Sequence, residues 1–423
     1  MTKNRIVDAL KKNTMLIALV FVFIVFELLI NILGKSGSMF SASNIAGLIS
    51  QNGYIVILAV GMLLCIIAGG NIDLSVGSIV ALVGAFAGKL MVSGNVPIPL
   101  TIIICAVIGI AIGSWQGFWI AYMRIPAFIV TLAGMLMFRG FSQLVMNSET
   151  INGIPDKFNQ LFGGSIDVRF FFGGGDSAHA AEYDKWYDGL SATKVAVTPG
   201  VGTGFLSLSV IIAVVLCAIL IWRGIASRSA NVKAGNNVPS FAWFAAKLAV
   251  ICAIVLYVSY LLGSQNGIPL VLILLAVLII AYSYYTKNTV PGRRLYAMGG
   301  NEKAAKLSGI DTNKILFFSY ANMGFLSAIA AMVCVARQGS VSTSLGQGFE
   351  LDAIGACFIG GASAYGGTGK VSGAVIGAVF MGVLSNGMDI IGVDQNWKNA
   401  IKGAVLLAAV VFDVISQKRR QSA

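Results

Sequence analysis

Long apolar runs, separated by short polar segments, follow one another along almost the whole chain. A bilayer core about 30 Å thick needs roughly 20 apolar residues in one helix, and most of the runs meet that need. They cover residues 15–33, 45–68, 74–92, 98–123, 127–146, 205–222, 241–262, 269–285, 315–336, 351–361, 371–388 and 400–415. The pattern predicts an all-α fold, a polytopic membrane helix bundle of ten to twelve transmembrane helices.

The range of ten to twelve depends mainly on residues 351–361, which are too few to cross a bilayer alone. They continue into the Gly- and Ser-rich stretch 362–369. We therefore interpret this segment as a broken or re-entrant helix, which needs protein or a cavity around its backbone. The first run follows basic residues, as in a signal peptide, but its length predicts an uncleaved span.

Composition and charge support a membrane protein. Apolar residues make up 57% and charged residues 11% of the 423 positions, whereas a soluble domain has roughly 25% charged residues. The net charge of +12 is spread along the chain, which argues against a nucleic-acid partner. With the N-terminus inside, 18 Lys and Arg fall in cytoplasmic segments and 7 in outer ones. The positive-inside rule thus predicts cytoplasmic termini and a multi-pass protein of the cell membrane.

We expect one transmembrane domain over residues 1–423, with a long polar loop at 147–204. This loop lies outside and carries seven acidic against four basic residues. Loops of this length are usually functional or disordered. Two interpretations remain open, a docking segment or lid on the one hand and a plain insertion on the other.

Residues suited to catalysis are scarce. The single His179 excludes most acid–base, triad and zinc arrangements, and the six Cys fall inside apolar runs, where they suit packing. The string 366–370 resembles the end of a phosphate loop, but Ala364 and Val371 stand where that motif needs Gly and Ser or Thr. It is interpreted as a turn between helices. We expect no enzyme, no metal site and no cofactor.

Three of the charged residues in or between the apolar runs are candidates for a specific role. Asp73 has two compatible interpretations, because Asp caps helix N-termini well and an embedded ionisable group is costly unless it serves a pathway or a gate. Glu27 and Arg139 lie within runs and are candidates for pairing across helices.

Small residues form two further patterns. Glycine recurs every four positions in three runs, at Gly109/Gly113/Gly117, Gly84/Gly88 and Gly373/Gly377. This spacing lets helices approach closely in lipid, either as packing alone or as surfaces that slide during transport. Residues 65–71 and 357–363 are also similar to one another, and each precedes a Gly-rich run. Such internal repeats are typical of transporters built from two halves.

The segment 292–310 is polar and projects between two runs on the cytoplasmic side. Asn301 suits the N-cap of a short helix over residues 302–307, which Gly309 can end. A helix this short buries little by itself. Ala304, Ala305 and Leu307 are expected to be exposed and to fit a groove on another protein.

Three segments resemble those of one family. They are residues 70–78 (Gly-Asn-Ile-Asp-Leu-Ser-Val-Gly-Ser), residues 292–310, and residues 360–369 followed by Asn386-Gly-Met, Gly392-Val, Trp397 and Ile401-Lys-Gly403. Together they resemble the permease subunits of the ribose/xylose/galactose class of bacterial ABC sugar importers. The likeness covers most of residues 45–162 and 267–415. The two-span insertion at 163–266 resembles xylose and multiple-monosaccharide permeases.

The resemblance implies a mechanism and its partners. Two permease copies, as a homodimer in lipid, would work with cytoplasmic ABC ATPase subunits and an extracytoplasmic sugar-binding protein. The coupling loop 286–314 would dock on the ATPase through Gly299, Gly300, Asn301, Glu302, Ala304, Ala305, Leu307, Ser308 and Gly309. The substrate pathway would include Asn71, Asp73, Ser75 and Ser78. The sugar would be xylose or a related pentose or hexose such as arabinose, glucose or galactose.

Two rival functions remain open on these grounds. An ABC permease for nucleosides or amino acids would have the same architecture. An ion-coupled secondary transporter would need embedded acidic or histidine relays, which are scarce here.

Overall fold

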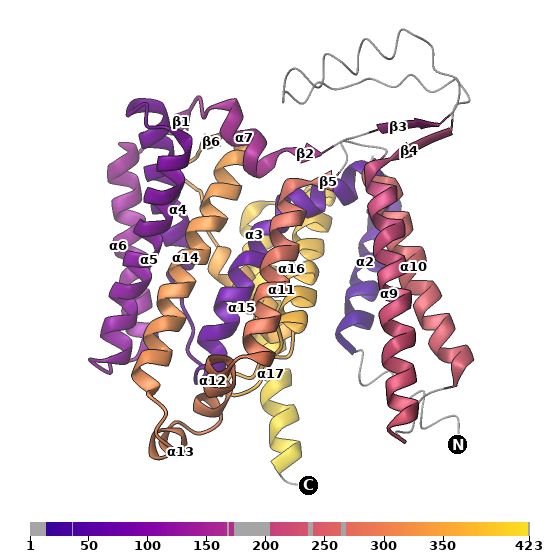
Figure 1. Cartoon of the computed structure of the whole chain (residues 1–423). Helices are drawn as coiled ribbons and strands as arrows, with labels where there is room; N and C mark the ends of the chain where they lie inside the picture. Colours follow the sequence, from indigo (N-terminus) through magenta and orange to yellow (C-terminus); the bar gives the residue numbers. More distant parts are fainter. Residues whose placement is uncertain are drawn as a thin grey trace. The chain divides into compact units, whose positions relative to one another are not determined.

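The computed structural model describes residues 14–35, 37–166, 169–172, 204–235, 240–263 and 268–421. Each apolar run coincides with a helix, so the predicted all-helical class is confirmed (Figure 1). The chain divides into two compact units. Unit 1 comprises residues 1–39, 48–163 and 271–423, and unit 2 comprises residues 40–47 and 164–270.

Unit 1 is a helical bundle. Two of its helices, α3 and α11, begin in unit 2 with their first residues. Its helices are α2 (Thr14–Ile32), α3 (Ala42–Ile67), α4 (Val76–Gly88) with the π-helical turn η1 (Lys89–Ser93), α5 (Ile98–Ala121), α6 (Ala127–Met146), α7 (Asp156–Gly163), α11 (Leu270–Asn288), α12 (Val290–Gly300), α13 (Glu302–Leu307), α14 (Thr312–Gln338), α15 (Phe349–Ile359), α16 (Val371–Ile391) and α17 (Gln395–Gln421).

The two ends of unit 1 differ in what they carry. At one end, strand β1 (Ile151–Asn152) pairs with β6 (Ser340–Val341) next to α7. At the other end, α12 and α13 project between α11 and α14 (Figure 1). The segment 292–310 therefore lies at the end of unit 1 opposite to β1 and α7.

Unit 2 consists mainly of two packed helices and short strands. The helices are α9 (Leu208–Lys233) and α10 (Phe241–Gly263). The strands pair antiparallel, β2 (Ser165–Ile166) with β5 (Ile268–Pro269) and β3 (Arg169–Phe172) with β4 (Gly204–Ser207). His179 and most of the acidic residues of the 147–204 loop lie outside the described residues.

Within the described ranges, nine helices are long and apolar enough to cross a membrane. The other three predicted spans also form helices, α2, α15 and α17. Of these, α15 has 11 residues, which at 1.5 Å per residue gives about half of the bilayer core. It is buried over residues 352–358 and turns through residues 360–370 into α16. This geometry agrees with the interpretation of an interrupted helix shielded by protein.

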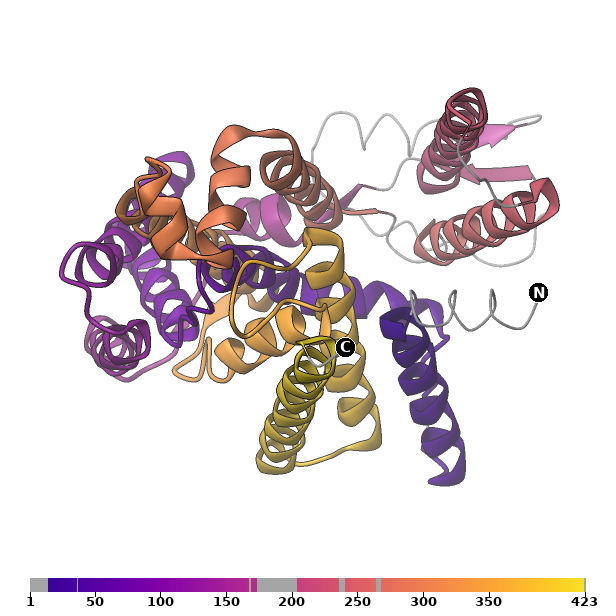
Figure 2. The same cartoon turned by 90° about the horizontal axis from the view of Figure 1, so that it is seen from below.

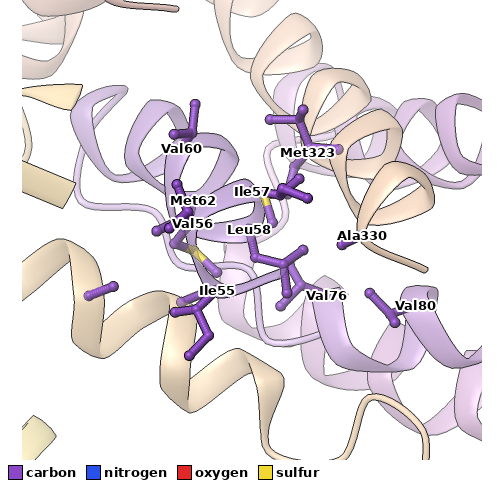
Figure 3. Close-up of a cluster of buried hydrophobic side chains, with 14 of the residues drawn as sticks. Ile55, Val56, Ile57, Leu58, Val60, Met62, Val76, Val80, Met323 and Ala330 are labelled. Carbon is purple, nitrogen blue, oxygen red and sulfur yellow. The ribbon is translucent and has the colours of Figure 1, made fainter. Parts of the chain in front are cut away.

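The core of unit 1 forms around α3, whose residues from Ile55 to Ile67 are buried without interruption. Figure 3 shows Ile57 and Leu58 of α3 beside Val76 of α4 and Met323 of α14. A helix that is apolar all round in this way belongs in the centre of a bundle. The views in Figures 1 and 2 show the other helices of unit 1 arranged around it.

Close packing at the glycine repeats is confirmed, and in two of the three repeats the glycine lies against the backbone of another helix. A Cβ on Gly113 of α5 would overlap the Tyr320 carbonyl of α14, and one on Gly377 of α16 would overlap the Ala356 carbonyl of α15. Gly84 instead packs against side chains, those of Leu345 and Val335. All six Cys are free thiols in helices.

The side chains of Glu27 and Arg139, which were candidates for pairing across helices, form hydrogen bonds with connecting segments. Glu27 accepts hydrogen bonds from the Ser38 hydroxyl and from the Met39 N–H. Arg139 donates to the Leu345 carbonyl in the segment between β6 and α15. The described hydrogen bonds of both residues thus tie a helix to a loop.

Candidate functional site

Parts of the three segments that carry the family resemblance, namely residues 70–71, 298–302 and 364–367, meet at one end of unit 1. The N–H of Gly367 donates a hydrogen bond to the Ile67 carbonyl at 2.9 Å, so the 360–369 turn rests on the end of α3. A Cβ on Gly299 would overlap that same carbonyl, and a Cβ on Gly367 would crowd Gly300. The string that resembled a phosphate loop is therefore a turn packed between α3 and α12, as predicted.

Local chemistry explains why α12 and α13 form. The Thr289 hydroxyl accepts a hydrogen bond from the Gly292 N–H at the start of α12. The Asn301 side chain accepts one from the Ala304 N–H at 3.0 Å, which is an N-cap as predicted. Gly309, at φ +79°, allows the chain to leave α13 in the left-handed region.

The expected exposure of α13 is correct for two of its three apolar residues. Leu307 is 91% exposed and Ala304 is also exposed, but Ala305 is buried, with 5% of its surface accessible. The prediction for Ala305 was wrong, because one face of this short helix packs onto its neighbours α12 and α14. The outward face of α13 therefore carries Ala304, Leu307 and the charged side chains.

A cavity of about 360 Å³ lies beside α13. It is bounded by the loop after α3, the turn between α5 and α6, the α12–α13 junction and Tyr365 of the 360–369 turn. Its polar wall includes Asn71, Arg124, Asn301 and Glu302. Asn71, expected on the substrate pathway, is thus placed together with residues expected to couple to a partner.

The loop from Ile72 to Ser75 is held by a chain of buried hydrogen bonds. The Ser75 N–H and hydroxyl both donate to one Asp73 carboxylate oxygen, at 2.9 and 2.6 Å. The Gln116 side chain of α5 donates to the Ser75 hydroxyl at 2.6 Å. The Thr131 hydroxyl of α6 lies 3.5 Å from the Ile72 carbonyl. Helices α5 and α6 both reach this loop through polar groups.

Asp73 is fully buried, as predicted, but it is not the N-cap of α4. Ser75 occupies that position, and Asp73 accepts the Ser75 N–H one step before the helix begins. Burial raises the pKa of Asp73 to about 6, and the hydrogen bonds from Ser75 oppose that shift. Ser78 is buried in the first turns of α4.

Three polar constellations were not predicted. Gln116 and Arg124 lacked any sequence signal, since a single Gln or Arg at a helix end is common. Lys402 was visible as a charge within an apolar run, but its partners were not. Its ammonium lies 2.8 Å from the Asp352 carboxylate of α15, which also accepts a hydrogen bond from the Tyr54 hydroxyl at 2.8 Å. This buried pair joins α15 to α17 and α3.

Within the described part of the chain, no group of three or more His, Cys, Asp or Glu could hold a metal ion. The polar groups at the α13 end of unit 1 are instead short hydrogen-bonded links between segments. Amide, hydroxyl and carboxylate groups of this kind can form hydrogen bonds with a neutral polar molecule.

The chain matches a family model described as the permease component of branched-chain amino acid transport systems, over residues 44–226 and 190–410. It is 36% identical to the xylose transport system permease protein XylH of Haemophilus influenzae, over 96% of each chain. Its identity to XylH of Escherichia coli is 36%, over 90% of this chain and 88% of the relative.

A ribose permease is also similar. The chain is 29% identical to the ribose import permease protein RbsC of Escherichia coli, over 89% of this chain and 88% of the relative. No solved structure matches the chain.

Proposed function

Because the chain belongs to the permease family of ATP-binding-cassette importers, we propose that it moves xylose or a related pentose or hexose across the cell membrane. One observation carries the sugar assignment, the 36% identity to a xylose permease over 96% of both chains. The family model itself is named for branched-chain amino acids, so amino acids are the second candidate.

The chain is a multi-pass membrane subunit that transports rather than catalyses. As a member of this importer family, it works with an ATPase and a binding protein. We propose in addition that two copies form the pathway as a homodimer. The sugar-binding protein would supply affinity, so the permease needs only weak polar contacts.

The proposal also includes the membrane topology of the chain. Both termini lie in the cytoplasm, and α2 and α17 cross the membrane in addition to the nine helices that meet the length and hydropathy requirements within the described ranges. Helix α15 leads from β6 at one end of unit 1 to the 360–369 turn at the α13 end. Counted with its flanking segments as one further crossing, it brings the proposed total to twelve, an even number that leaves both termini on the same side. The 147–204 loop faces outward and contacts the binding protein.

The coupling function falls to α13. The proposal rests on its position at one end of unit 1, its capped geometry and the exposed Leu307. A large apolar side chain that is 91% exposed on a polar projection can serve as an anchor in a pocket of a partner. The ATPase subunit is the partner that the family requires at the cytoplasmic side.

Replacing Leu307 by Asp tests this function. We expect sugar uptake to fall at least tenfold, because a buried charge at an interface costs more than about 1.4 kcal/mol. The matched control is Val290→Asp, which places the same acid on an exposed residue at the start of α12. An acidic residue is favourable at a helix N-terminus, so this variant should fold and transport.

The measurement is uptake of labelled xylose in cells that also produce the ATPase and the binding protein, with the amount of permease in the membrane determined in parallel. Uptake by Leu307→Asp equal to that of Val290→Asp would contradict the docking function of α13.

A further inference from the structure

Arg124 occupies an unusual backbone position in the turn between α5 and α6. Its φ is +57°, in the left-handed region that costs an ordinary side chain roughly 1 kcal/mol. The other described non-Gly residues with positive φ are two Asn and a Ser, Asn95, Asn147 and Ser148, which are shorter. A long basic side chain at such a position needs compensating contacts.

The guanidinium of Arg124 provides those contacts to two other elements. One nitrogen donates to the Glu302 carboxylate, the first residue of α13, at 2.5 Å. The other donates to the side chains of Thr312 and Asn313 at the start of α14. The planar fork of Arg suits several acceptors at once, so a single side chain joins the α5–α6 turn, α13 and α14.

Stability alone does not account for this cluster. The side chains of Arg124 and Glu302 are 41% and 44% exposed, and exposed ion pairs contribute little to the free energy of unfolding. The orientation of α13 depends more strongly on these contacts than the stability of the protein does, because α13 has six residues and buries only Ala305. A helix with so little packing takes its direction from its cap and from Arg124.

The same turn connects α13 to the loop that holds Asp73. Arg124 follows α5, whose Gln116 donates to Ser75, and precedes α6, whose Thr131 lies against Ile72. Arg124 therefore joins α13 to the turn between α5 and α6, and side chains of these same two helices contact the loop 72–75.

We infer that Arg124 is a positioning residue that fixes α13 through Glu302 and links its movement to α5 and α6. This inference rests on the proposed coupling function of α13. It reassigns Glu302, which was expected to face the ATPase, to a contact within the permease.

The test uses the complete transporter, with its ATPase and binding protein, reconstituted in lipid. The variants are Arg124→Gln, Glu302→Gln, the double variant and Arg124→Lys. Lys314→Gln is the matched control, because it removes one basic side chain near the start of α14 that pairs only locally with Asp311. Two quantities are measured, labelled xylose moved per ATP hydrolysed and hydrogen exchange of the amides in residues 302–308.

Arg124→Gln should raise the exchange rate of these amides about fivefold, the factor expected for loss of one exposed ion pair. It should lower xylose moved per ATP by a similar or larger factor, while the assembled complex is recovered in normal amount. Glu302→Gln should change both quantities in the same direction, because it removes the contact with Arg124 but leaves the hydrogen bonds of Arg124 to Thr312 and Asn313. The double variant should be no worse than Arg124→Gln alone, since that variant already removes the contact with Glu302. Arg124→Lys should lie in between, and Lys314→Gln should match the unaltered transporter.

Unchanged exchange in Arg124→Gln, or additive effects in the double variant, would overturn the inference. Leu307→Asp separates the two claims. If Leu307→Asp transports normally, the docking function of α13 fails whatever Arg124 does. If Leu307→Asp abolishes transport while Arg124→Gln retains normal xylose per ATP, only the positioning function of Arg124 fails.

Discussion

Single glycines determine how closely the segments at the α13 end of unit 1 approach one another. Gly299 and Gly300 are neighbours in the same segment, but they meet different surroundings. A Cβ on Gly299 would overlap the Ile67 carbonyl, whereas a Cβ on Gly300 would have no described neighbour within 4 Å. Close packing therefore requires a glycine at position 299 but not at position 300.

Gly299→Ala should therefore destabilise the protein by about 1–3 kcal/mol, the usual cost of overpacking against a backbone that cannot move. Gly300→Ala should change stability little. The measurement is the apparent unfolding temperature of each purified variant in detergent. Equal unfolding temperatures for the two variants would mean that the close contact between α12 and α3 does not exist in solution.

Sequence reasoning at single residues succeeded where the chemistry is local. The Asn301 cap and the helix end at Gly309 follow from side chains that bond to their own neighbours. It failed for Ala305, because its burial depends on how α12, α13 and α14 pack together, and for the partner of Glu302, because that partner is far away along the chain. The contact of Glu302 with Arg124 spans 178 positions.

Helix α15 illustrates how an element too short to cross the membrane is held in place. Its Asp352 has 1% of its side chain exposed and lies 2.8 Å from the Lys402 ammonium of α17. Removing one partner of a buried pair leaves an uncompensated charge, which costs far more than the pair contributes.

Lys402→Met should accordingly reduce the free energy of unfolding by about 3–5 kcal/mol. Adding Asp352→Asn should restore part of that loss, because the unpaired charge is then gone. The control is Lys398→Met on the same helix, whose partner Asp389 is 54% exposed, so its cost should stay within about 1 kcal/mol. The measurement is the unfolding temperature of the three variants. A decrease for Lys398→Met as large as that for Lys402→Met would contradict a stabilising role of the buried pair.

Periodicity and length predicted the elements well, since a run of apolar residues in this protein has no other stable form than a helix. The apolar runs alone do not show which helices are in contact. The backbone contact of α5 with α14 depends on Gly113 meeting Tyr320, and nothing in either run identifies the other. The similar segments 65–71 and 357–363 both contain a helix end, that of α3 at Ile67 and that of α15 at Ile359. Ile67 contacts Gly367, which lies in the turn after the second segment.

The whole molecule combines a buried helical core with a small projecting helix. In unit 1 the resemblance segments come together although 222 positions separate Gly70 from Gly292 in the chain. That convergence explains why a family resemblance spread over three segments was informative: each segment supplies one wall of the same junction. The division into two units was not visible in the apolar pattern, because α9 and α10 are as apolar as the other spans.

The central claim is that this chain is the membrane subunit of an ATP-driven monosaccharide importer. The direct measurement is uptake of labelled xylose into proteoliposomes that contain the permease and its ATPase, with the binding protein added outside and ATP inside. Competition by unlabelled arabinose, ribose, glucose, galactose and leucine defines the substrate class. We predict uptake that requires both ATP and the binding protein, persists when ion gradients are collapsed, and is inhibited by sugars but not by leucine. Uptake that continues without ATP and stops when the ion gradient is removed would contradict the account.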